Sequence, residues 1–419
     1  MGQSSLDDKV YPQADELLSK YGPFAQLWFD TPTRITVEQS KKLLGFVRER
    51  QPACIVNSRL GPGGDKEWGD YISLRDNEVP TMPLTRNGET CATINGNWGY
   101  NQYDLHYRPA HEIARLLADV VAKNANYLLN IGPDSLGRVP EGSARVLRDI
   151  GRWLETNGEA IYETNPTPFA SDLDWGAVTA RAGRVYFHMY DSPGESLTIR
   201  GLNNAASTAC FLDDPDAALP VSQKPVQGTR GLLDTTIELG ANAPQQMHRV
   251  LALDIDGRAD VCPETIQQPG GLVTLESLVA RNVETGEPMS NEIMVRGAVA
   301  KSLQEGHVME WAFEILEPGT FTVCLECATG RYSDGGGKRV ADTSHEVTVE
   351  IDGQSIEGTV EEQERLAVRG NAHWPAIRCT IGSVQIEEAG THTLRLRVRH
   401  VHMGKGNGFI LRQVRLAAS

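Results

Sequence analysis

Apolar residues in the first 165 positions recur at the spacing of amphipathic helices. From Ile113 they occupy positions i, i+3, i+4, i+7 and i+8, which places them on one helical face. Thr36 and Gln39 open another such segment and have the spacing of a capping box. The pattern therefore predicts helices over residues 13–20, 36–50, 109–123 and 140–157.

Short apolar runs lie between these helices. They cover residues 25–30, 53–59 and 126–133, and residues 89–100 contain a further possible strand. A strand that is apolar on both faces is expected in a parallel sheet whose faces are covered by helices. The alternation of strands and helices therefore predicts an α/β domain, and both a doubly wound sheet and a (β/α) barrel fit it.

Three of the apolar runs contain or end in polar residues: Asp30, Arg59 and Asn130. In both α/β architectures functional residues gather at the carboxyl ends of the strands. Arg59 could hold a sugar hydroxyl or tune a carboxylate, or it could form a structural ion pair. These strand ends are the first indication of a functional site.

The pattern changes after residue 165, where short strands alternate with turn residues. Strands at 183–191, 195–202, 208–214 and 249–257 predict a small β-sandwich over residues 166–260. Residues 261–284 are typical of a linker, and evenly spaced strands over 285–419 predict a second sandwich. The predicted fold is therefore a multidomain one, with an α/β region over residues 1–165 followed by two all-β sandwich domains.

Charge and hydropathy narrow the possible partners. The formal net charge is −15, which repels phosphate backbones, so nucleic acid is not an expected partner. No run approaches the roughly 20 apolar residues that span a bilayer, so a membrane is not expected either. The N-terminus has no basic segment followed by an apolar core, so the expected location is cytoplasmic by default, although a lost N-terminus could change this.

Motifs of several other chemistries are missing from the sequence. The glycine-bearing segment NIGPDSLGR lacks the G-K-[ST] of a phosphate loop, and no G-x-S-x-G elbow occurs. Cys324 and Cys327 form a C-x-x-C pair that could be a redox or metal motif, but no second Cys or His pair has ligand spacing. The pair is better interpreted as two positions on one strand. We therefore expect no metal and no organic cofactor.

Carboxylates and tryptophans favour a carbohydrate site. Hydrolysis of a glycosidic bond usually needs two carboxyl groups, and aromatic rings stack on the apolar face of a sugar. Asp30 and Glu89 are candidates for the carboxyl groups, and Trp28, Trp68 and Trp98 for the rings. From the residues alone, Asp30 could equally cap a turn, Glu89 could be a solvated loop residue, and each tryptophan could belong to the core.

Four segments between about residue 12 and residue 165 carry a family resemblance. They are YGPFAQLWFDTP, ETCATINGNWGYNQYD, ARLLADVVAKNANYLLNIGPDSLGRVPEG and IGRWLETNGEAIYET. Their order and spacing resemble those of glycoside hydrolase family 29, the retaining α-L-fucosidases. The strands over 183–257 also resemble the small β-sandwich that follows the catalytic domain in that family, and the last domain resembles carbohydrate-binding sandwiches in a general way.

The resemblance implies catalytic roles for two carboxyl groups. Asp30, in the L-W-F-D motif, matches the family's nucleophile, and Glu89, in the E-T-C motif, matches the general acid/base of many members. Because the acid/base position varies in the family, Glu67 is the alternative. The implied reaction is the release of terminal α-L-fucose from a glycan by double displacement with retention.

The resemblance also implies three substrate-binding residues. Trp28 matches a tryptophan that lines the fucose pocket, and Arg59 matches a substrate-binding arginine. Trp98, in the W-G-Y motif, is expected to line the pocket as well.

The chain departs from the family at its start. Members carry the first half of the catalytic barrel before this point, with histidines and aromatic residues that hold the fucose hydroxyls. The resemblance therefore implies a half TIM-like barrel, from an internal start, an engineered fragment or a shortened gene. A half-barrel would expose an unpaired parallel edge, so we expect a homo-oligomer in which another copy covers it.

Three hypotheses remain open on the sequence. The first is an α-L-fucosidase, with activity weakened by the truncation. The second is a catalytically inactive carbohydrate-binding or assembly remnant of a fucosidase. The third is a retaining glycosidase of another specificity, because the missing half contributes much of the sugar recognition.

Overall fold

The computed structural model divides the chain into two compact units. Unit 1 comprises residues 1–78, 84–93 and 124–130, and unit 2 comprises residues 79–83, 94–123 and 131–419. The structure describes residues 5–30, 35–61, 68–80, 82–170, 173, 175–191, 193–227, 229, 231–240, 248–286, 294–295, 298–299, 303–328, 343–366, 376–402 and 409–419.

Five short parallel strands follow one another in unit 1. They are β1 (Gln26–Leu27), β2 (Ile55–Val56), β3 (Ile72–Ser73), β4 (Gly88–Thr93) and β5 (Ala125–Asn130). Strand β1 pairs with β2, and β4 pairs with both β3 and β5, all in parallel register. A parallel bridge between Asn57 and Tyr71 joins the two groups. The strands thus lie in chain order within an α/β region, and β3 was not among the strands that the apolar runs predicted.

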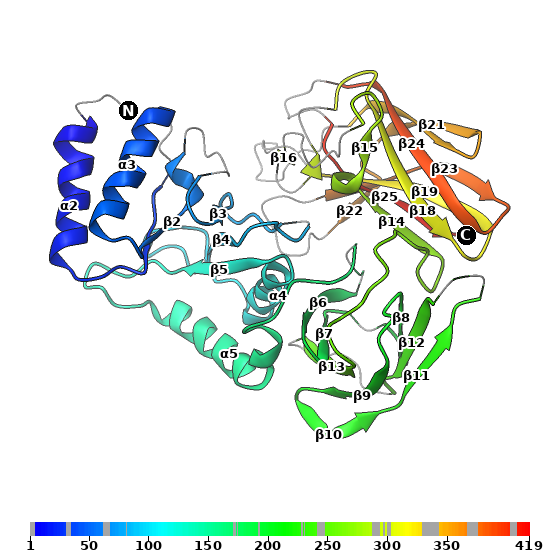
Figure 1. Cartoon of the computed structure of the whole chain (residues 1–419), viewed down its shortest axis with the longest axis horizontal. Helices are drawn as coiled ribbons and strands as arrows, with labels where there is room; N and C mark the ends of the chain where they lie inside the picture. The colour runs from blue at the N-terminus through cyan, green and yellow to red at the C-terminus, as the bar shows by residue number, and fades with distance from the viewer. Residues whose placement is uncertain are drawn as a thin grey trace. The chain divides into compact units, whose positions relative to one another are not determined.

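The helices of unit 1 begin with a π-helical turn, η1 (Leu6–Val10), which leads into α2 (Tyr11–Lys20). Helix α3 (Val37–Arg50) begins at the capping box that the sequence predicted, with Thr36 as the N-cap and Gln39 as its partner. Figure 1 shows α2 and α3 lying alongside each other. Their apolar faces meet the strands in a core that includes Leu18, Leu43 and Val56.

Unit 2 contributes two further helices, α4 (Ala110–Val121) and α5 (Glu141–Asn157), the second followed by a 3-10 turn, η4 (Gly158–Ala160). Both predicted amphipathic helices are therefore confirmed. They share a core with the first β-sandwich, in which Ala118 and Trp153 pack with Tyr186, Tyr190 and Val250. The helices are thus anchored to the sandwich by buried apolar contacts.

The first sandwich consists of two antiparallel sheets. One has the order β10-β9-β13-β7-β6 and the other β11-β12-β8. Their strands are β6 (Gly176–Arg181), β7 (Arg184–Met189), β8 (Ser196–Arg200), β9 (Ala206–Phe211), β10 (Asp214–Leu219), β11 (Val221–Pro225), β12 (Leu233–Glu238) and β13 (Arg249–Ile255). Phe187, Ile199 and Leu251 are among the buried residues that fill the space between the sheets.

The second sandwich has a seven-stranded and a five-stranded sheet. The first has the order β16-β17-β25-β19-β23-β22 with β14 also on β25, and the second β15-β18-β24-β20-β21. Their strands are β14 (Leu272–Glu276), β15 (Arg281–Asn282), β16 (Met294–Val295), β17 (Ala298–Val299), β18 (Val308–Ile315), β19 (Gly319–Ala328), β20 (His345–Ile351), β21 (Gln354–Val360), β22 (Glu364–Leu366), β23 (Ala376–Ile386), β24 (Gly390–His400) and β25 (Leu411–Ala418). A 3-10 turn, η5 (Ser277–Val279), separates β14 from β15.

The start of the second sandwich differs from the sequence interpretation. Strands β14 and β15 lie within residues 261–284, which the pattern assigned to a linker. Strand β14 pairs with β25 over five residues because its alternating apolar side chains, such as Val273 and Leu275, enter the core. The glycines at 270 and 271, directly before β14, indicated a turn, so the strand that follows them was not predicted.

Among the residues that the structure describes, no helix combines the length and the apolar character needed to cross a bilayer.

Candidate active site

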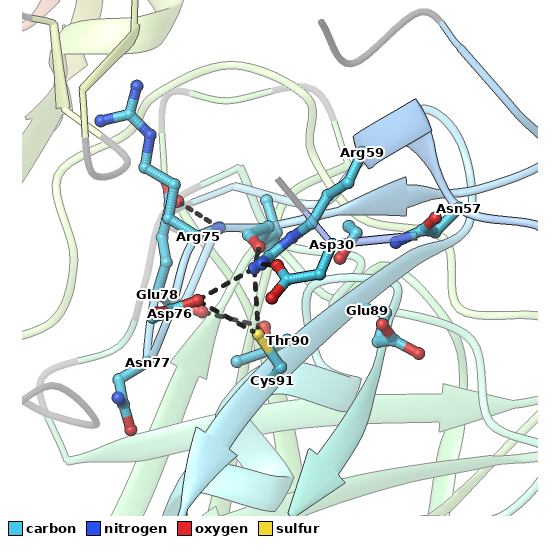
Figure 2. Close-up of polar contacts among 12 residues, drawn as sticks. Asp30, Asn57, Arg59, Arg75, Asp76, Asn77, Glu78, Glu89, Thr90 and Cys91 are labelled. Carbon is cyan, nitrogen blue, oxygen red and sulfur yellow. Dashed lines mark hydrogen bonds and ion pairs between the residues drawn. The ribbon is translucent and has the colours of Figure 1, made fainter. Parts of the chain in front are cut away.

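Three parallel strands of unit 1 supply the candidate site, two of them from their carboxyl ends and β4 from its second residue. Trp28 and Asp30 follow β1, Arg59 lies in a 3-10 turn (η2, Ser58–Leu60) after β2, and Glu89 lies on β4. Figure 2 shows Asp30 and Arg59 directed toward each other, with Glu89 nearby on its own strand. The parallel pairing of these strands brings residues that are far apart in the sequence into one site.

Glu89 is a buried carboxyl group, with the residue only 7% exposed. The indole Nε1 of Trp28 donates a hydrogen bond to its Oε1 at 2.6 Å, and Gln26 Nε2 donates to its Oε2 at 3.4 Å. Gln26 also donates to the hydroxyl of Tyr71 at 2.6 Å. Burial, together with the charge of Glu89, raises the pKa of Tyr71, which therefore stays a neutral phenol. These contacts fix the orientation of the Glu89 carboxyl group.

Arg59 is the centre of a second set of contacts, and its side chain is only 12% exposed. Its Nη1 lies 3.2 Å from Asp30 Oδ1, and its Nη2 lies 3.1 Å from Asp76 Oδ1. Nη2 also donates to the carbonyl oxygen of Leu74 at 2.6 Å and lies 3.1 Å from Cys91 Sγ. Figure 2 shows Asp30, Asp76 and Cys91 around the guanidinium group.

Trp28 connects the two sets of contacts. The guanidinium carbon of Arg59 lies 4.8 Å from the centroid of the Trp28 ring, a cation–π geometry, while the ring nitrogen binds Glu89. Asp30, Arg59, Trp28 and Glu89 therefore form one continuous chain of contacts. A displacement of any member would be passed to the next through an ion pair, a ring contact or a hydrogen bond.

The backbone before Asp30 is locked by a buried asparagine. Asn57, which is 0% exposed, accepts a hydrogen bond from the Phe29 N–H at 2.9 Å and donates to the Phe29 carbonyl oxygen at 2.8 Å. The amide side chain thus replaces the strand pairing that ends at Leu27. This double contact holds the residue that precedes Asp30, while the Asp30 side chain itself remains 66% exposed.

Cys91 is a buried thiol within this site. Burial raises its pKa to about 11, and the nearby Arg59 guanidinium acts in the opposite direction. At neutral pH it is therefore a neutral thiol, and its Sγ lies 3.7 Å from Asp76 Oδ1. Its place beside Arg59 is one of packing and hydrogen bonding, since a neutral thiol is a poor nucleophile.

The structure unites four of the six residues to which the family resemblance gave roles. Trp28, Asp30, Arg59 and Glu89 lie in unit 1, in one network. Trp98 lies in unit 2 and is 41% exposed, and Glu67 falls outside the described residues. The network also contains residues that the sequence did not single out: Gln26, Asn57, Tyr71, Asp76 and Cys91.

The arrangement supplies two carboxyl groups that suit nucleophilic and acid–base chemistry. Asp30 is an exposed carboxylate held beside a permanent cation, and Glu89 is a buried carboxyl group of fixed orientation. Retaining glycosidases use such a pair, one group as nucleophile and the other as proton donor. Within the described residues, no three His, Cys, Asp or Glu side chains are arranged to hold a metal ion.

Comparison with known proteins shows what the first part of the chain is similar to. Residues 2–159 match the family model described as alpha-L-fucosidase. This part of the chain is similar to the α-L-fucosidase family. The plasma α-L-fucosidase of Rattus norvegicus is 33% identical to it over 167 residues, which make up 38% of this chain and 36% of the relative. The chain thus spans about a third of the length of that fucosidase.

Solved fucosidase structures share the fold. The α-L-fucosidase from Vibrio sp. strain EJY3 matches 99% of this chain and 70% of its own with a TM-score of 0.81 at 24% identity. Isoenzyme 1 from Paenibacillus thiaminolyticus matches 59% of this chain and 62% of its own with a TM-score of 0.53 at 28% identity. The order of an α/β region followed by two sandwiches is therefore found along almost the whole chain in the Vibrio fucosidase.

Proposed function

We propose that the chain is a retaining glycoside hydrolase that releases terminal α-L-fucose from fucosylated glycans or glycosides. The observation that carries the proposal is the continuous chain of contacts from Asp30 through Arg59 and Trp28 to Glu89. It presents one exposed carboxyl group after β1 and one buried carboxyl group on β4. The similarity of residues 2–159 to the α-L-fucosidase family supports fucose as the sugar.

In the first step, Asp30 attacks the anomeric carbon of fucose and Glu89 protonates the departing glycosidic oxygen. The exposed Asp30 carboxylate can reach a substrate, and Arg59 Nη1, 3.2 Å from its Oδ1, holds it in position. The bond from the anomeric carbon to the leaving oxygen breaks as the bond to Asp30 Oδ forms. The product of this step is a glycosyl ester on Asp30.

In the second step, Glu89 takes a proton from a water molecule, which attacks the anomeric carbon and frees Asp30. Two displacements restore the original configuration, so the released fucose keeps its α form. Trp28 has two roles in the proposal. Its indole N–H holds Glu89 in place, and its ring offers an apolar surface to the sugar. Arg59 binds the substrate, and Trp98 and Glu67 remain candidates for pocket lining and for the alternative acid/base.

We further propose that β1 to β5 form half of a (β/α) barrel, because they pair in parallel and in chain order. Ile55 on β2 and Leu128 on β5 are 42% and 44% exposed, although apolar side chains of a barrel strand are normally covered. We propose that a second copy of the chain covers them in a homo-oligomer. Light scattering on purified protein tests this, since a strictly monomeric chain would contradict it.

The proposed division of the chain is a catalytic region over residues 1–165, a small sandwich over 166–260 and a carbohydrate-binding-like sandwich that ends at 419. The buried cores of the two sandwiches are separate sets of residues, which supports two independent β domains. Glycan binding by residues 261–419 expressed alone would test the role of the last domain.

The experiment that tests the proposed activity is release of nitrophenol from nitrophenyl α-L-fucoside by the purified chain. Asp30→Ala, prepared identically, is the control, and circular dichroism checks that both proteins are folded. Turnover by the wild type and not by the variant supports the proposal. Equal inactivity of two folded proteins would favour an inactive carbohydrate-binding or assembly protein. Turnover of another nitrophenyl glycoside would indicate a different specificity.

A further inference from the structure

A cleft in unit 2 lies between the two helices and the first sandwich and is separate from the residues of the candidate active site. Its volume is about 800 Å³, and it is lined by the start of α4, by α5 and by β13. Small-molecule sites commonly measure about 300–1,000 Å³. The cleft is therefore large enough for a ligand with an organic body as well as a charged group.

Positive charge is concentrated in this cleft although the whole chain is acidic. Four arginines and two aspartates line it, so two positive charges are left unbalanced. Arg249 lies beside Asp213 with a shortest Nε–oxygen distance of 2.8 Å, and Arg152 pairs with Asp149. Arg108 and Arg145 form no ion pair with any residue that the structure describes. These two guanidinium groups are the ones available to a ligand.

The amino end of α4 opens into the same cleft. Pro109, Ala110 and His111 line it, and no side chain caps the helix. The N–H groups of a first helical turn have no partner within the helix, and the helix dipole places partial positive charge there. Because the Glu112 N–H donates to the Pro109 carbonyl oxygen at 3.1 Å, it is the N–H groups of Ala110 and His111, beside two unpaired arginines, that form a site for oxygen atoms with negative charge.

An independent observation is a buried histidine with unsatisfied nitrogens. His248 is 1% exposed and lines the cleft, yet neither of its ring nitrogens has a hydrogen-bond partner among the described residues. Its ring is packed 4.6 Å from that of Trp153, whose Nε1 donates to the His248 carbonyl oxygen at 3.1 Å. Buried polar atoms are normally satisfied, so an unpaired imidazole at the wall of a cleft indicates a missing partner.

The wall of the cleft also offers an apolar surface. Tyr107, Val146 and Trp153 line it beside the arginines. The Tyr107 ring packs against Gly142, where any side chain would overlap it, so the ring is held in place. Such a surface complements the carbon skeleton of a ligand and not a bare inorganic ion.

We propose that this cleft binds a small anionic molecule through an oxyanion group, a phosphate, sulfate or carboxylate, held by Arg108, Arg145 and the first turn of α4. The organic body of the ligand rests on Tyr107 and Trp153. The site does not depend on the proposed fucosidase activity, because none of its residues takes part in that reaction.

Calorimetric titration of the full chain tests the proposal with four probes at constant ionic strength: inorganic phosphate, glucose 6-phosphate, glucuronate and glucose. Glucose is the neutral control. We expect glucose 6-phosphate or glucuronate to bind and glucose not to bind. Tighter binding of glucose 6-phosphate than of inorganic phosphate would show that the ligand body contributes. Binding of none of the anions, or of inorganic phosphate alone, would overturn the proposal.

Variants locate the binding. In Arg108→Gln/Arg145→Gln, loss of two charge-assisted contacts should weaken the affinity by about tenfold or more. Both side chains lack ion pairs, so the variant is expected to fold. Arg148 lies on α5, as Arg145 does, but it does not line the cleft. Arg148→Gln is therefore the matched control and should bind as the wild type does. Asp30→Ala should also bind normally. Equal affinity in the double variant, or a loss in either control, would overturn the assignment.

Discussion

Two networks in this chain each contain a buried charged residue, and they differ in how far the carboxylates of the network are exposed to solvent. In unit 1, Arg59 is buried, but its partners Asp30 and Asp76 are 66% and 57% exposed. In the second sandwich, Glu326 is buried at 4%, and its oxygens accept from Arg378 at 2.8 Å, Gln413 at 2.8 Å and Arg415 at 3.3 Å. The first network leaves a carboxylate open to a ligand, and the second encloses one.

The difference separates a functional from a structural use of buried charge. A buried charge is tolerated when every lone pair or proton is satisfied, and Glu326 meets this condition within the protein. Arg59 is satisfied in part by the carboxylate of Asp30, which is itself exposed. Burial of a charged residue alone therefore does not mark an active site.

The largest expected effect is on the exposed end of the first network. Asp30→Ala removes the proposed nucleophile and should lower kcat on nitrophenyl α-L-fucoside by roughly 10⁴-fold or more. The variant should fold, because an exposed ion pair contributes only about 0–1 kcal/mol. Steady-state kinetics with added azide give the check. Azide should restore turnover in the variant by taking the place of the carboxylate, and substantial activity without azide would contradict the assigned role.

The next effect concerns the buried carboxyl group. Glu89→Gln keeps the shape and removes the proton transfer, so kcat should fall by about 10² to 10⁴-fold for a leaving group that needs protonation. A dinitrophenyl fucoside needs little protonation, and its first step should be nearly unaffected. Burst kinetics with the two substrates measure this contrast. The same loss on both would remove Glu89 from the acid role and direct attention to Glu67.

In the enclosed network the expected effect is on stability and not on catalysis. Glu326→Gln leaves Arg378 and Arg415 without their shared carboxylate and should lower the free energy of unfolding by about 2–3 kcal/mol, with kcat unchanged. Glu310→Gln is the matched control, because Glu310 pairs with Arg395, whose side chain is 53% exposed. That change should cost less than about 1 kcal/mol. Chemical denaturation measures the free energy of unfolding of both variants. A drop in kcat for Glu326→Gln would contradict the assignment of a purely structural role to this network.

The smallest effect concerns the second carboxylate beside Arg59. Asp76→Asn removes one of two charged partners, so Arg59 should position Asp30 and the substrate less well. A two- to fivefold loss of kcat/KM is expected, corresponding to about 1 kcal/mol or less. Asp15→Asn, which breaks an exposed pair with Arg50 on the helices of unit 1, is the control and should leave kcat/KM unchanged. Equal effects of the two changes would mean that Asp76 has no particular role.

The sequence predicted those parts of the fold that have strong local signals. The capping box at Thr36 and the apolar stripe of α4 are local in the chain, and both helices formed as predicted. Strands β10 and β11 were not foreseen, because their residues are mostly exposed and show no apolar alternation. Such edge strands are formed by backbone pairing with a neighbour that is known only once the sheet is assembled.

The residues of the candidate site were likewise predicted only where they belong to a local motif. Trp28, Asp30, Arg59 and Glu89 belong to recognisable motifs at strand ends. Asn57, which locks the backbone before Asp30, had no signal of its own, since a buried asparagine looks like any loop residue in the sequence. Asp76 and Cys91 likewise could not be identified from the sequence, because only tertiary folding brings them into contact with Arg59.

The covalent intermediate is the most direct test of the central claim that Asp30 is the nucleophile of a retaining fucosidase. The purified chain would be treated with 2-fluoro-fucosyl fluoride, which slows both displacements, and then digested and mapped by mass spectrometry. The account predicts a fluoro-fucosyl ester on Asp30 and no adduct in Asp30→Ala. An adduct on another carboxylate, or none on a chain that hydrolyses nitrophenyl α-L-fucoside, would contradict it.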